Sequence, residues 1–314
     1  MLTQTVSLKG GGSVSHTEDS AKPNRKTKRV LWIVLAVILL LAGWIWWQIY
    51  RSYHDVQLSE QIWQTDKVSE PIDILMMSDL HDHQFGNNNE ELTDLAASSD
   101  PDLILLNGDM INDDTNSIDE LIDLVRQLSK TAPVYLSMGN QEYENPKWSE
   151  FQKRLDEEGI EILDADFRDL KINGQNIRLG GLYDYSFALN GYDSVEESRM
   201  DPKTVSFLHE FQDTDALKII MTHRPDTFLF NQSPDYWDVD LALCGHTHGG
   251  QIVLPFGGGL WAPDQGWFPE YVKGVTHNGN LTLITSSGLS SGHEKLPRFN
   301  NPPEILMVRI VAES

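Results

Sequence analysis

Residues 72–81 read IDILMMSDLH, an apolar stretch that ends in polar residues. Ile, Leu and Met dominate its first six positions, which predicts a buried β-strand. Asp79 and His81 follow the strand and are two positions apart. Residues with this spacing in an extended segment share a face, so both side chains can point into one cleft. The stretch therefore predicts a strand of a sheet with a site at its carboxyl end.

The same arrangement recurs along the chain. Apolar strands alternate with helical patterns up to residue 159, and strands dominate afterwards. Strands are expected in 102–109, 133–140, 170–182, 217–223, 239–248, 281–288 and 304–312, and helices in 91–100, 117–130 and 148–159. Asn173 and Gly174 predict a hairpin turn. Apolar strands alternating with helices imply an α/β fold whose parallel or mixed sheet is covered on both faces.

Most of the strong strands end in residues that bind metals. Besides Asp79 and His81, the strand-terminal residues are Asp109, Asn140, His223, His246 and His248. Ligands bind at the carboxyl ends of strands in open α/β sheets. Any one of these elements alone could be an ordinary turn, because Gly-Asp and Gly-Asn dipeptides are common there. The complete series is not explained by turn chemistry. Asp, Asn and His donors suit divalent Mn, Fe or Zn.

The series D-x-H, GD, GN, a strand-terminal His and GHTHGGQ resembles the calcineurin-like metallophosphoesterase superfamily. The stretches TAPVYLSMGN, MTHRPDTF, LCGHTHGGQIVLP and LPRFNNPPEI resemble its membrane-associated bacterial branch, which includes phosphodiesterases. The resemblance covers about residues 70 to 312. It implies a two-sheet α/β sandwich with flanking helices.

The resemblance also implies two divalent metal ions. Asp79, His81 and His248 would hold one ion, Asn140, His223 and His246 would hold the other, and Asp109 would bridge them. Two ions held this way clamp a phosphate and activate a water molecule. The implied reaction is hydrolysis of a phosphomonoester, a phosphodiester or a pyrophosphate, and a phosphodiester is favoured.

One position departs from the family pattern. The third strand is normally followed by G-N-H-[DE], but this chain has Gln141 after Asn140. Glutamine cannot deliver a proton at neutral pH. The enzyme could use substrates with a good leaving group, or His83 could replace the missing catalytic histidine. Alternatively, the protein could be a pseudoenzyme that binds metal and phosphate without turnover. A surface-loop role for His83 is the simpler reading.

Residues 30–47, VLWIVLAVILLLAGWIWW, form an uninterrupted apolar run. Its length, its terminal aromatic residues and the absence of a small-x-small cleavage site predict a transmembrane anchor rather than a signal peptide. Basic residues precede the run, so the N-terminus is expected in the cytoplasm of a single-pass cell-membrane protein. The organisation expected is a disordered tail at 1–29, an anchor at 30–50, a stalk at 51–70 and an extracytoplasmic catalytic domain at 71–314.

The chain is strongly acidic, with a formal net charge of −23. Nucleic-acid binding is therefore not expected. Cys244 is the sole cysteine, which excludes an intrachain disulfide, and it is expected to pack as a small apolar residue. Arg298 could pair with a phosphate or form a structural ion pair. His277 and His293 are expected at the surface.

The predicted membrane anchor bears on the class of substrate. Proximity to a membrane suggests a phospholipid or an envelope precursor as the phosphate ester. Residues 261–268, WAPDQGWF, could form an apolar wall near the cleft or could simply pack in the core. Exposure of these aromatic side chains would favour a lipid-like substrate.

Overall fold

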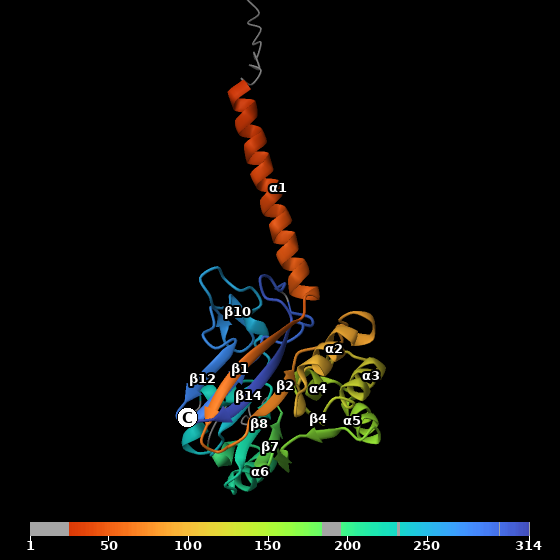
Figure 1. Ribbon diagram of the computed structural model, residues 1–314, viewed down its shortest axis with the longest axis vertical. Coiled ribbons are helices and arrows are strands. Elements are labelled where there is room, and N and C mark those ends of the chain that lie inside the picture. The colour runs from red at the N-terminus through yellow and green to blue at the C-terminus, as the bar shows by residue number, and fades with distance from the viewer. Residues whose placement is uncertain (1–24, 184–195, 231–232, 295, 314) are drawn as a thin grey trace, which may run out of the picture. The chain divides into compact units, whose positions relative to one another are not determined.

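The computed structural model describes residues 25–183, 196–230, 233–294 and 296–313. The chain divides into two compact units, Met1–Ile45 and Trp46–Ser314. Helix α1, Arg25–His54, runs across the division between them (Figure 1). It is long and apolar enough to cross a membrane. The expected tail at 1–29 lies outside the described residues, except for 25–29, which are helical.

The second unit contains two sheets that are six-stranded within the described residues. The first has the order β1-β14-β2-β3-β4-β5, and the second has the order β12-β13-β9-β8-β7-β6. The strands of the first sheet are β1 Gln57–Thr65, β2 Ile72–Met77, β3 Leu103–Asn107, β4 Val134–Ser137, β5 Glu161–Leu163 and β14 Glu304–Ala312. Those of the second are β6 Asp166–Ile172, β7 Gln175–Leu182, β8 Leu217–Thr222, β9 Leu241–Cys244, β12 Gly274–Asn278 and β13 Leu281–Thr285.

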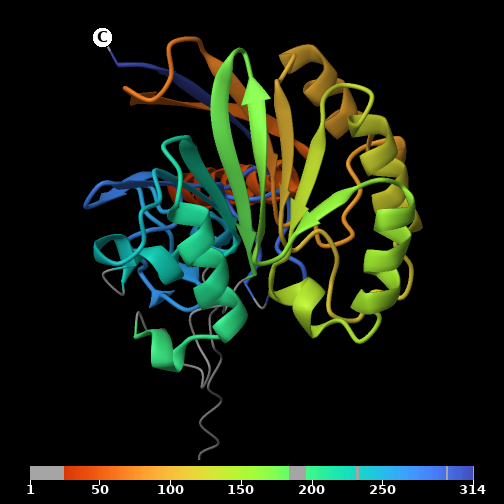
Figure 2. The ribbon, with the colours of Figure 1, turned by 90° about the horizontal axis from the view of Figure 1, so that it is seen from below.

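Helices cover the outer faces of both sheets. The first sheet is covered by α2 Glu90–Ser99, α3 Asp119–Leu128 and α5 Trp148–Glu157, and the second by α6 Pro202–Gln212 and α7 Asp226–Leu229. The connecting segments contain α4 Asn140–Glu144 and the 3₁₀ turns η1 Asn87–Asn89, η2 Glu197–Arg199, η3 Ser233–Asp235 and η4 His248–Gly250. Figure 2 shows the two sheets face to face, with α3 and α5 in yellow to yellow-green along the outer face of the first sheet.

The alternation along β2 explains how the first sheet packs on both of its faces. Ile74 and Met76 belong to the apolar cluster between the sheets, whereas Leu75 and Met77 belong to the cluster under α2, α3 and α5. A third cluster lies between the second sheet and α6. Strands buried on both faces are apolar throughout, which is why the strand sequences show little alternation of polarity. The predicted two-sheet α/β sandwich is confirmed.

The segment expected to be a stalk, 51–70, has a different structure. It contains the end of α1 and strand β1, which pairs in parallel with β14 from Gln57↔Glu304 to Thr65↔Ala312. The burial of β1 alternates along its length, as expected of an edge strand with one covered face. Local polarity does not predict this alternation, because the more covered positions include Gln57, Ser59 and Gln61 whereas Leu58 and Ile62 are exposed. The compact unit that contains both six-stranded sheets therefore starts at Trp46 rather than at residue 71.

Candidate metal centre

The predicted ligands lie in the loops that follow the strands. Asp79 follows β2, Asp109 follows β3, and Asn140 is the first residue of α4. His223 follows β8 directly, and His246 lies two residues beyond β9. Since β2 pairs in parallel with β3, and β8 with β9, the loops of each sheet leave from one edge. A backbone hydrogen bond from Asp79 N to Gly108 O (3.0 Å) ties the first two loops together.

Several of these residues have unusual backbone conformations. φ is positive at Asp79 (56°), His81 (52°), Asp109 (54°), His246 (68°) and His248 (47°). For side chains other than glycine this region costs about 1–3 kcal/mol per residue and tends to cluster at functional sites. All five residues lie within four positions after the end of a strand. This clustering is the first structural indication that the strand-end loops are built for a ligand.

Glycines beside the ligands allow the loops to approach one another. A Cβ atom on Gly139 would lie 2.2 Å from Oδ1 of Asp109, and one on Gly245 would lie 2.6 Å from Oδ2 of Asp79. Any other residue would displace these carboxylates. The glycines of the GN and GHTH motifs are therefore required by the close packing of the ligand loops.

The side chains form two buried groups. Asp79, His81 and His248 make one, and Asp109, His223 and His246 make the other, with the ligand atoms of each group within 4.8 Å of one another. Asp109 is close to both groups, because its Oδ2 lies 3.2 Å from Nε2 of His223 and 3.8 Å from Nε2 of His81. The two groups are thus adjacent, with the Asp109 carboxylate between them.

Two polar atoms at the site fit a metal ion. Nε2 of His81 and Oδ1 of Asn140 are buried and have no hydrogen-bond partner among the residues described. Such atoms are costly to bury unless a ligand satisfies them. The donor set of carboxylate, amide and imidazole suits a divalent ion. The residues present therefore fit the pair of ions that the sequence predicts.

Hydrogen bonds orient the imidazole rings. Nδ1 of His223 lies 2.9 Å from the carbonyl oxygen of Asn107, and Nδ1 of His248 lies 3.1 Å from that of Ser290. A carbonyl oxygen only accepts, so each Nδ1 carries the proton and each Nε2 presents its lone pair. Burial lowers the pKa of His248 to about 3, which keeps this ring neutral at pH 7. A neutral imidazole is the form that binds metals.

Asp264 is a site residue that the sequence did not reveal. It lies in the turn between β10, Trp261–Ala262, and β11, Gly266–Trp267, and its Oδ2 is 2.9 Å from Nε2 of His246. Nη1 of Arg224 is 3.7 Å from the same oxygen. Asp264 accepts a hydrogen bond from Nε2–H of His246 and so fixes the orientation of this ring, with Nδ1 as the nitrogen that could face a metal. Residues 263–266, PDQG, have the sequence of an ordinary turn, which gives no indication of a role for Asp264 at the site.

We expect Asp264→Asn to weaken Mn²⁺ binding by about 10–100-fold, the usual effect of losing a carboxylate that orients a metal-bound histidine. Titration of the metal-free protein with Mn²⁺ measures the affinity, and circular dichroism checks the fold. Asp235→Asn, in η3, is the control for loss of one surface charge. Equal affinities in all three proteins would show that Asp264 does not orient His246.

Glu142 is a second supporting residue. Its buried carboxylate accepts hydrogen bonds from the backbone N–H groups of Asp109 (2.8 Å), Met110 (2.7 Å), Ile111 (3.3 Å) and Gly139 (2.9 Å). It thereby joins the loop after β3 to the loop after β4. Burial, with the Asp109 carboxylate nearby, raises the pKa of Glu142. The acidic residue that ends the family's G-N-H-[DE] pattern thus holds Asp109 in place.

The two remaining predicted catalytic residues lie outside both ligand groups. Oε1 of Gln141 accepts a hydrogen bond from Asp113 N (2.8 Å), while its backbone N–H donates to Oδ1 of Asp109 (2.9 Å). Nε2 of His83 lies 3.1 Å from the carbonyl oxygen of Tyr53 near the end of α1. Burial lowers the pKa of His83, so its ring is largely neutral at pH 7.

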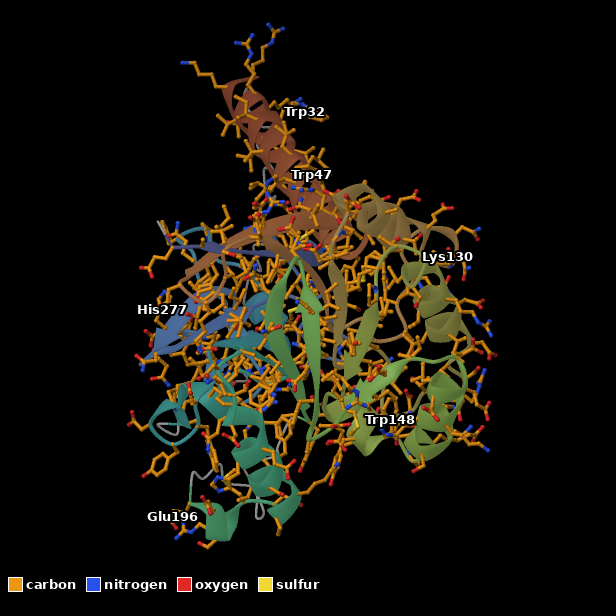
Figure 3. The ribbon with its side chains drawn as sticks, turned by 60° about the horizontal axis from the view of Figure 1, so that its bottom comes forward. Trp32, Trp47, Lys130, Trp148, Glu196 and His277 are labelled. Carbon is orange, nitrogen blue, oxygen red and sulfur yellow. The ribbon has the colours of Figure 1, made fainter. Side chains whose placement is uncertain are left out.

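Arg298 has a structural role that differs from both alternatives raised by the sequence. Its guanidinium is fully buried and donates to backbone carbonyls, including those of Ser287 (2.9 Å), Ser290 (2.9 Å) and Asn301 (3.1 Å). Burial lowers its pKa to about 10. Arg298 therefore holds the loop whose Ser290 carbonyl orients His248. Cys244 is buried as expected, and His277 is exposed at the margin of the molecule (Figure 3).

Residues 72–250 match the model of the calcineurin-like phosphoesterase family. Phosphodiesterase YaeI of Escherichia coli is 28% identical over 249 residues, which cover 77% of this chain and 83% of that protein. YkuE of Bacillus subtilis, an uncharacterized metallophosphoesterase, is 28% identical over 265 residues, or 82% of this chain and 86% of that protein. The structure of a 5′-nucleotidase precursor from Thermus thermophilus aligns with a TM-score of 0.43 at 14% identity, covering 70% and 49% of the two chains. The family match spans both ligand groups, from Asp79 to His248, and the chain belongs to the calcineurin-like phosphoesterases, a family of metal-dependent phosphoric-ester hydrolases.

Proposed function

We propose that this protein is a membrane-anchored phosphodiesterase with a dinuclear metal centre. The observation that carries the proposal is the pair of adjacent buried ligand groups joined by Asp109, with unsatisfied His81 Nε2 and Asn140 Oδ1 atoms facing no partner among the described residues. One ion would be held by Asp79, His81 and His248. The other would be held by Asn140, His223 and His246, and Asp109 would bind both ions. Similarity to a protein named phosphodiesterase supports the choice of a diester.

The bound ions would neutralise phosphate charge and supply a water that ionises near neutral pH. In the hydrolysis, the water oxygen forms a bond to phosphorus while the bond from phosphorus to the leaving oxygen breaks. The residues of the chain keep the ligands in position: Glu142 holds Asp109, Asp264 holds His246, and the Ser290 carbonyl holds His248. This support matters because small displacements of reacting groups are costly in rate.

Gln141 defines the chemistry at the leaving group. Its side-chain amide can donate a hydrogen bond to a phosphate oxygen but cannot protonate an alkoxide. We therefore propose that the enzyme favours substrates whose leaving group needs no acid. His83 remains the candidate for an alternative proton donor, although its Nε2 would have to leave the Tyr53 carbonyl to serve as one.

The test is turnover of bis(p-nitrophenyl) phosphate by the full chain in detergent, because nitrophenolate leaves without acid assistance. We expect Mn²⁺-dependent release of nitrophenol that EDTA abolishes and added Mn²⁺ restores. Asp109→Ala provides the blank. Manganese bound by the unchanged protein without turnover above the blank would contradict the diesterase.

That last outcome would favour a second candidate function, a metal- and phosphate-binding pseudoenzyme. Gln141 in place of histidine is the observation behind it. The two candidates share the metal centre, so metal binding does not distinguish them. They differ in turnover alone, and the assay above decides between them.

We also propose that α1 is a single-pass anchor in the cell membrane, with a cytoplasmic N-terminus and an extracytoplasmic catalytic unit. The basic residues before the apolar run support this orientation. Cys244 is fully buried, so Ile62→Cys, at an exposed position of β1, would provide a single accessible thiol. A membrane-impermeant maleimide should label it on intact cells. Labelling only after lysis would reverse the proposed orientation.

A further inference from the structure

Three aromatic side chains are exposed around the β10–β11 hairpin. Phe256 is 101% exposed in the loop before the hairpin, Trp267 is 63% exposed in β11, and Phe268 is 70% exposed just after it. Exposed aromatic clusters are uncommon on soluble surfaces and mark sites of contact with proteins or membranes. We call these three residues the aromatic face.

Hydrogen bonds connect the aromatic face to the end of α1. Nε2 of Gln48 donates to Oδ1 of Asn300 (3.0 Å), and Nδ2 of Asn300 donates to the carbonyl oxygen of Val253 (3.3 Å), three residues before Phe256. Ser52 is buried, and its Oγ accepts from the backbone N–H of Asn301 (3.2 Å). The last turns of α1 are therefore packed into the catalytic unit close to the loop that bears Phe256.

This connection places the aromatic face near a bilayer surface. The apolar run ends at Trp47, and Gln48 is the first polar residue after it. Tryptophan and tyrosine at the end of a span sit at the membrane–water interface. Gln48 would then lie at the interface, and the loop it reaches through Asn300 would lie beside it.

An apolar pocket adjoins the aromatic face. It has a volume of about 580 Å³ and is lined by Trp261, Trp267, His293, Glu294 and Leu296. This volume is within the range of pockets that bind small molecules. Trp261 and Trp267 belong to the β10–β11 hairpin, and the other lining residues are His293, Glu294 and Leu296.

Both walls of the pocket are joined to the metal centre. Gly292, which precedes His293, touches a ligand ring, since a Cβ atom there would lie 2.6 Å from Nδ1 of His81. The hairpin bears Asp264, which contacts His246. The two segments that line the pocket are therefore the same segments that contact His81 and His246 of the two ligand groups.

We propose that the aromatic face docks in the lipid bilayer and that the pocket receives the hydrocarbon chain of an amphiphilic substrate. The substrate class is then phosphodiesters that carry a long alkyl or acyl chain. This inference rests on the proposed hydrolase function. Hydrolysis places the water oxygen on phosphorus, releases the leaving alcohol or phenol, and leaves the chain attached to the phosphate or to the released alcohol.

The net charge of the protein indicates which interaction would hold the aromatic face in a bilayer. At a net charge of −23, attraction to anionic lipids contributes little, so burial of apolar side chains must provide the binding. Docking should therefore occur on neutral phosphatidylcholine and should change little with ionic strength.

The first experiment measures docking of the full chain in phosphatidylcholine vesicles. Phe256→Cys and Ile62→Cys each carry a polarity-sensitive dye, because Cys244 is buried and does not react. Both positions are exposed, which makes them a matched pair. We expect nitroxide-labelled lipids to quench the dye at 256 at least about tenfold more than the dye at 62, at low and high salt. Equal quenching at the two positions would overturn docking, and the aromatic face would then be a candidate contact for a soluble partner.

The second experiment compares hexadecyl p-nitrophenyl phosphate with methyl p-nitrophenyl phosphate in the same vesicles. The two diesters share a leaving group and differ only in chain length. We expect the long chain to raise kcat/KM by at least about tenfold and Trp267→Ser to remove about tenfold from that ratio, because the chain loses an apolar wall. Ile62→Ser should leave the ratio unchanged.

The outcomes separate the two proposals. If neither diester is hydrolysed, the proposed hydrolase function fails, and the substrate class fails with it. If both are hydrolysed with equal kcat/KM, the hydrolase stands and the lipid-like substrate is overturned. The third outcome is that Trp267→Ser and Ile62→Ser lower the ratio of the two kcat/KM values by the same factor. In that case the preference for the long chain would come from partitioning of the substrate into the vesicles and not from the pocket.

Discussion

Asp109→Ala is expected to lower kcat/KM for bis(p-nitrophenyl) phosphate by at least about 10³-fold. Asp109 is the carboxylate that lies within reach of both ligand groups, 3.2 Å from His223 Nε2 and 3.8 Å from His81 Nε2. Its loss leaves two ions without the negative charge between them. Metal ions contribute several kcal/mol of charge stabilisation to a phosphoryl-transfer transition state, and each 1.36 kcal/mol is tenfold in rate.

The measurement combines kinetics with metal content. Bound manganese per protein should fall below the value of the unchanged protein, and the activity should not return at millimolar Mn²⁺. Asp123→Ala, on the exposed side of α3, removes a carboxylate far from the ligands and should keep both metal and activity. Full metal content with undiminished turnover in Asp109→Ala would remove Asp109 from the centre.

Gln141→His is expected to increase hydrolysis of diesters with poor leaving groups by about 10²-fold or more, the usual contribution of a general acid. Oε1 of Gln141 accepts a hydrogen bond from Asp113 N (2.8 Å). The imidazolium form that a general acid requires cannot accept this bond, because both of its ring nitrogens are donors, so the introduced histidine would give up the bond when it acts as an acid. Turnover of bis(p-nitrophenyl) phosphate should change little, because nitrophenolate needs no proton.

A series of aryl and alkyl methyl phosphates measures this effect as the dependence of log kcat/KM on the leaving-group pKa. The slope should be steep in the unchanged protein and shallow in Gln141→His. A shallow slope in the unchanged protein would mean that an acid is already present, and His83→Gln then tests whether that acid is His83. Equal slopes in the two proteins would show that the residue at position 141 does not act on the leaving group.

Much of the fold could be predicted from local sequence patterns. Buried strands such as Ile72–Met77 and Leu241–Cys244 are apolar on both faces, and the Asn173–Gly174 turn has φ values of 48° and 82° at its centre, as a type I′ hairpin requires. Strand β1 was not recognised as part of the sheet. Its partner β14 lies about 250 positions away in the sequence, and pairing at such separation leaves no local signal.

The candidate metal ligands could be located from sequence because each lies within four residues after the end of a strand, where chain order and spacing place it at one edge of a sheet. The supporting residues could not. Asp264, Asn112 and the Ser290 carbonyl act only through contacts with His246, His81 and His248. Their positions resemble ordinary turns, and only folding brings them to the rings.

The sequence by itself determined the α/β class, the apolar run of α1 and which residues are expected as metal ligands, because these depend on residue type and on spacing within short segments. The tertiary structure decided which residues orient those ligands, that Arg298 is bound by carbonyls, and that the end of α1 joins the catalytic unit beside the aromatic face. Those features depend on contacts between segments distant in the chain. The physical reason is that a side chain's hydrogen bonds and exposure are set by its neighbours in space, which the local sequence does not specify.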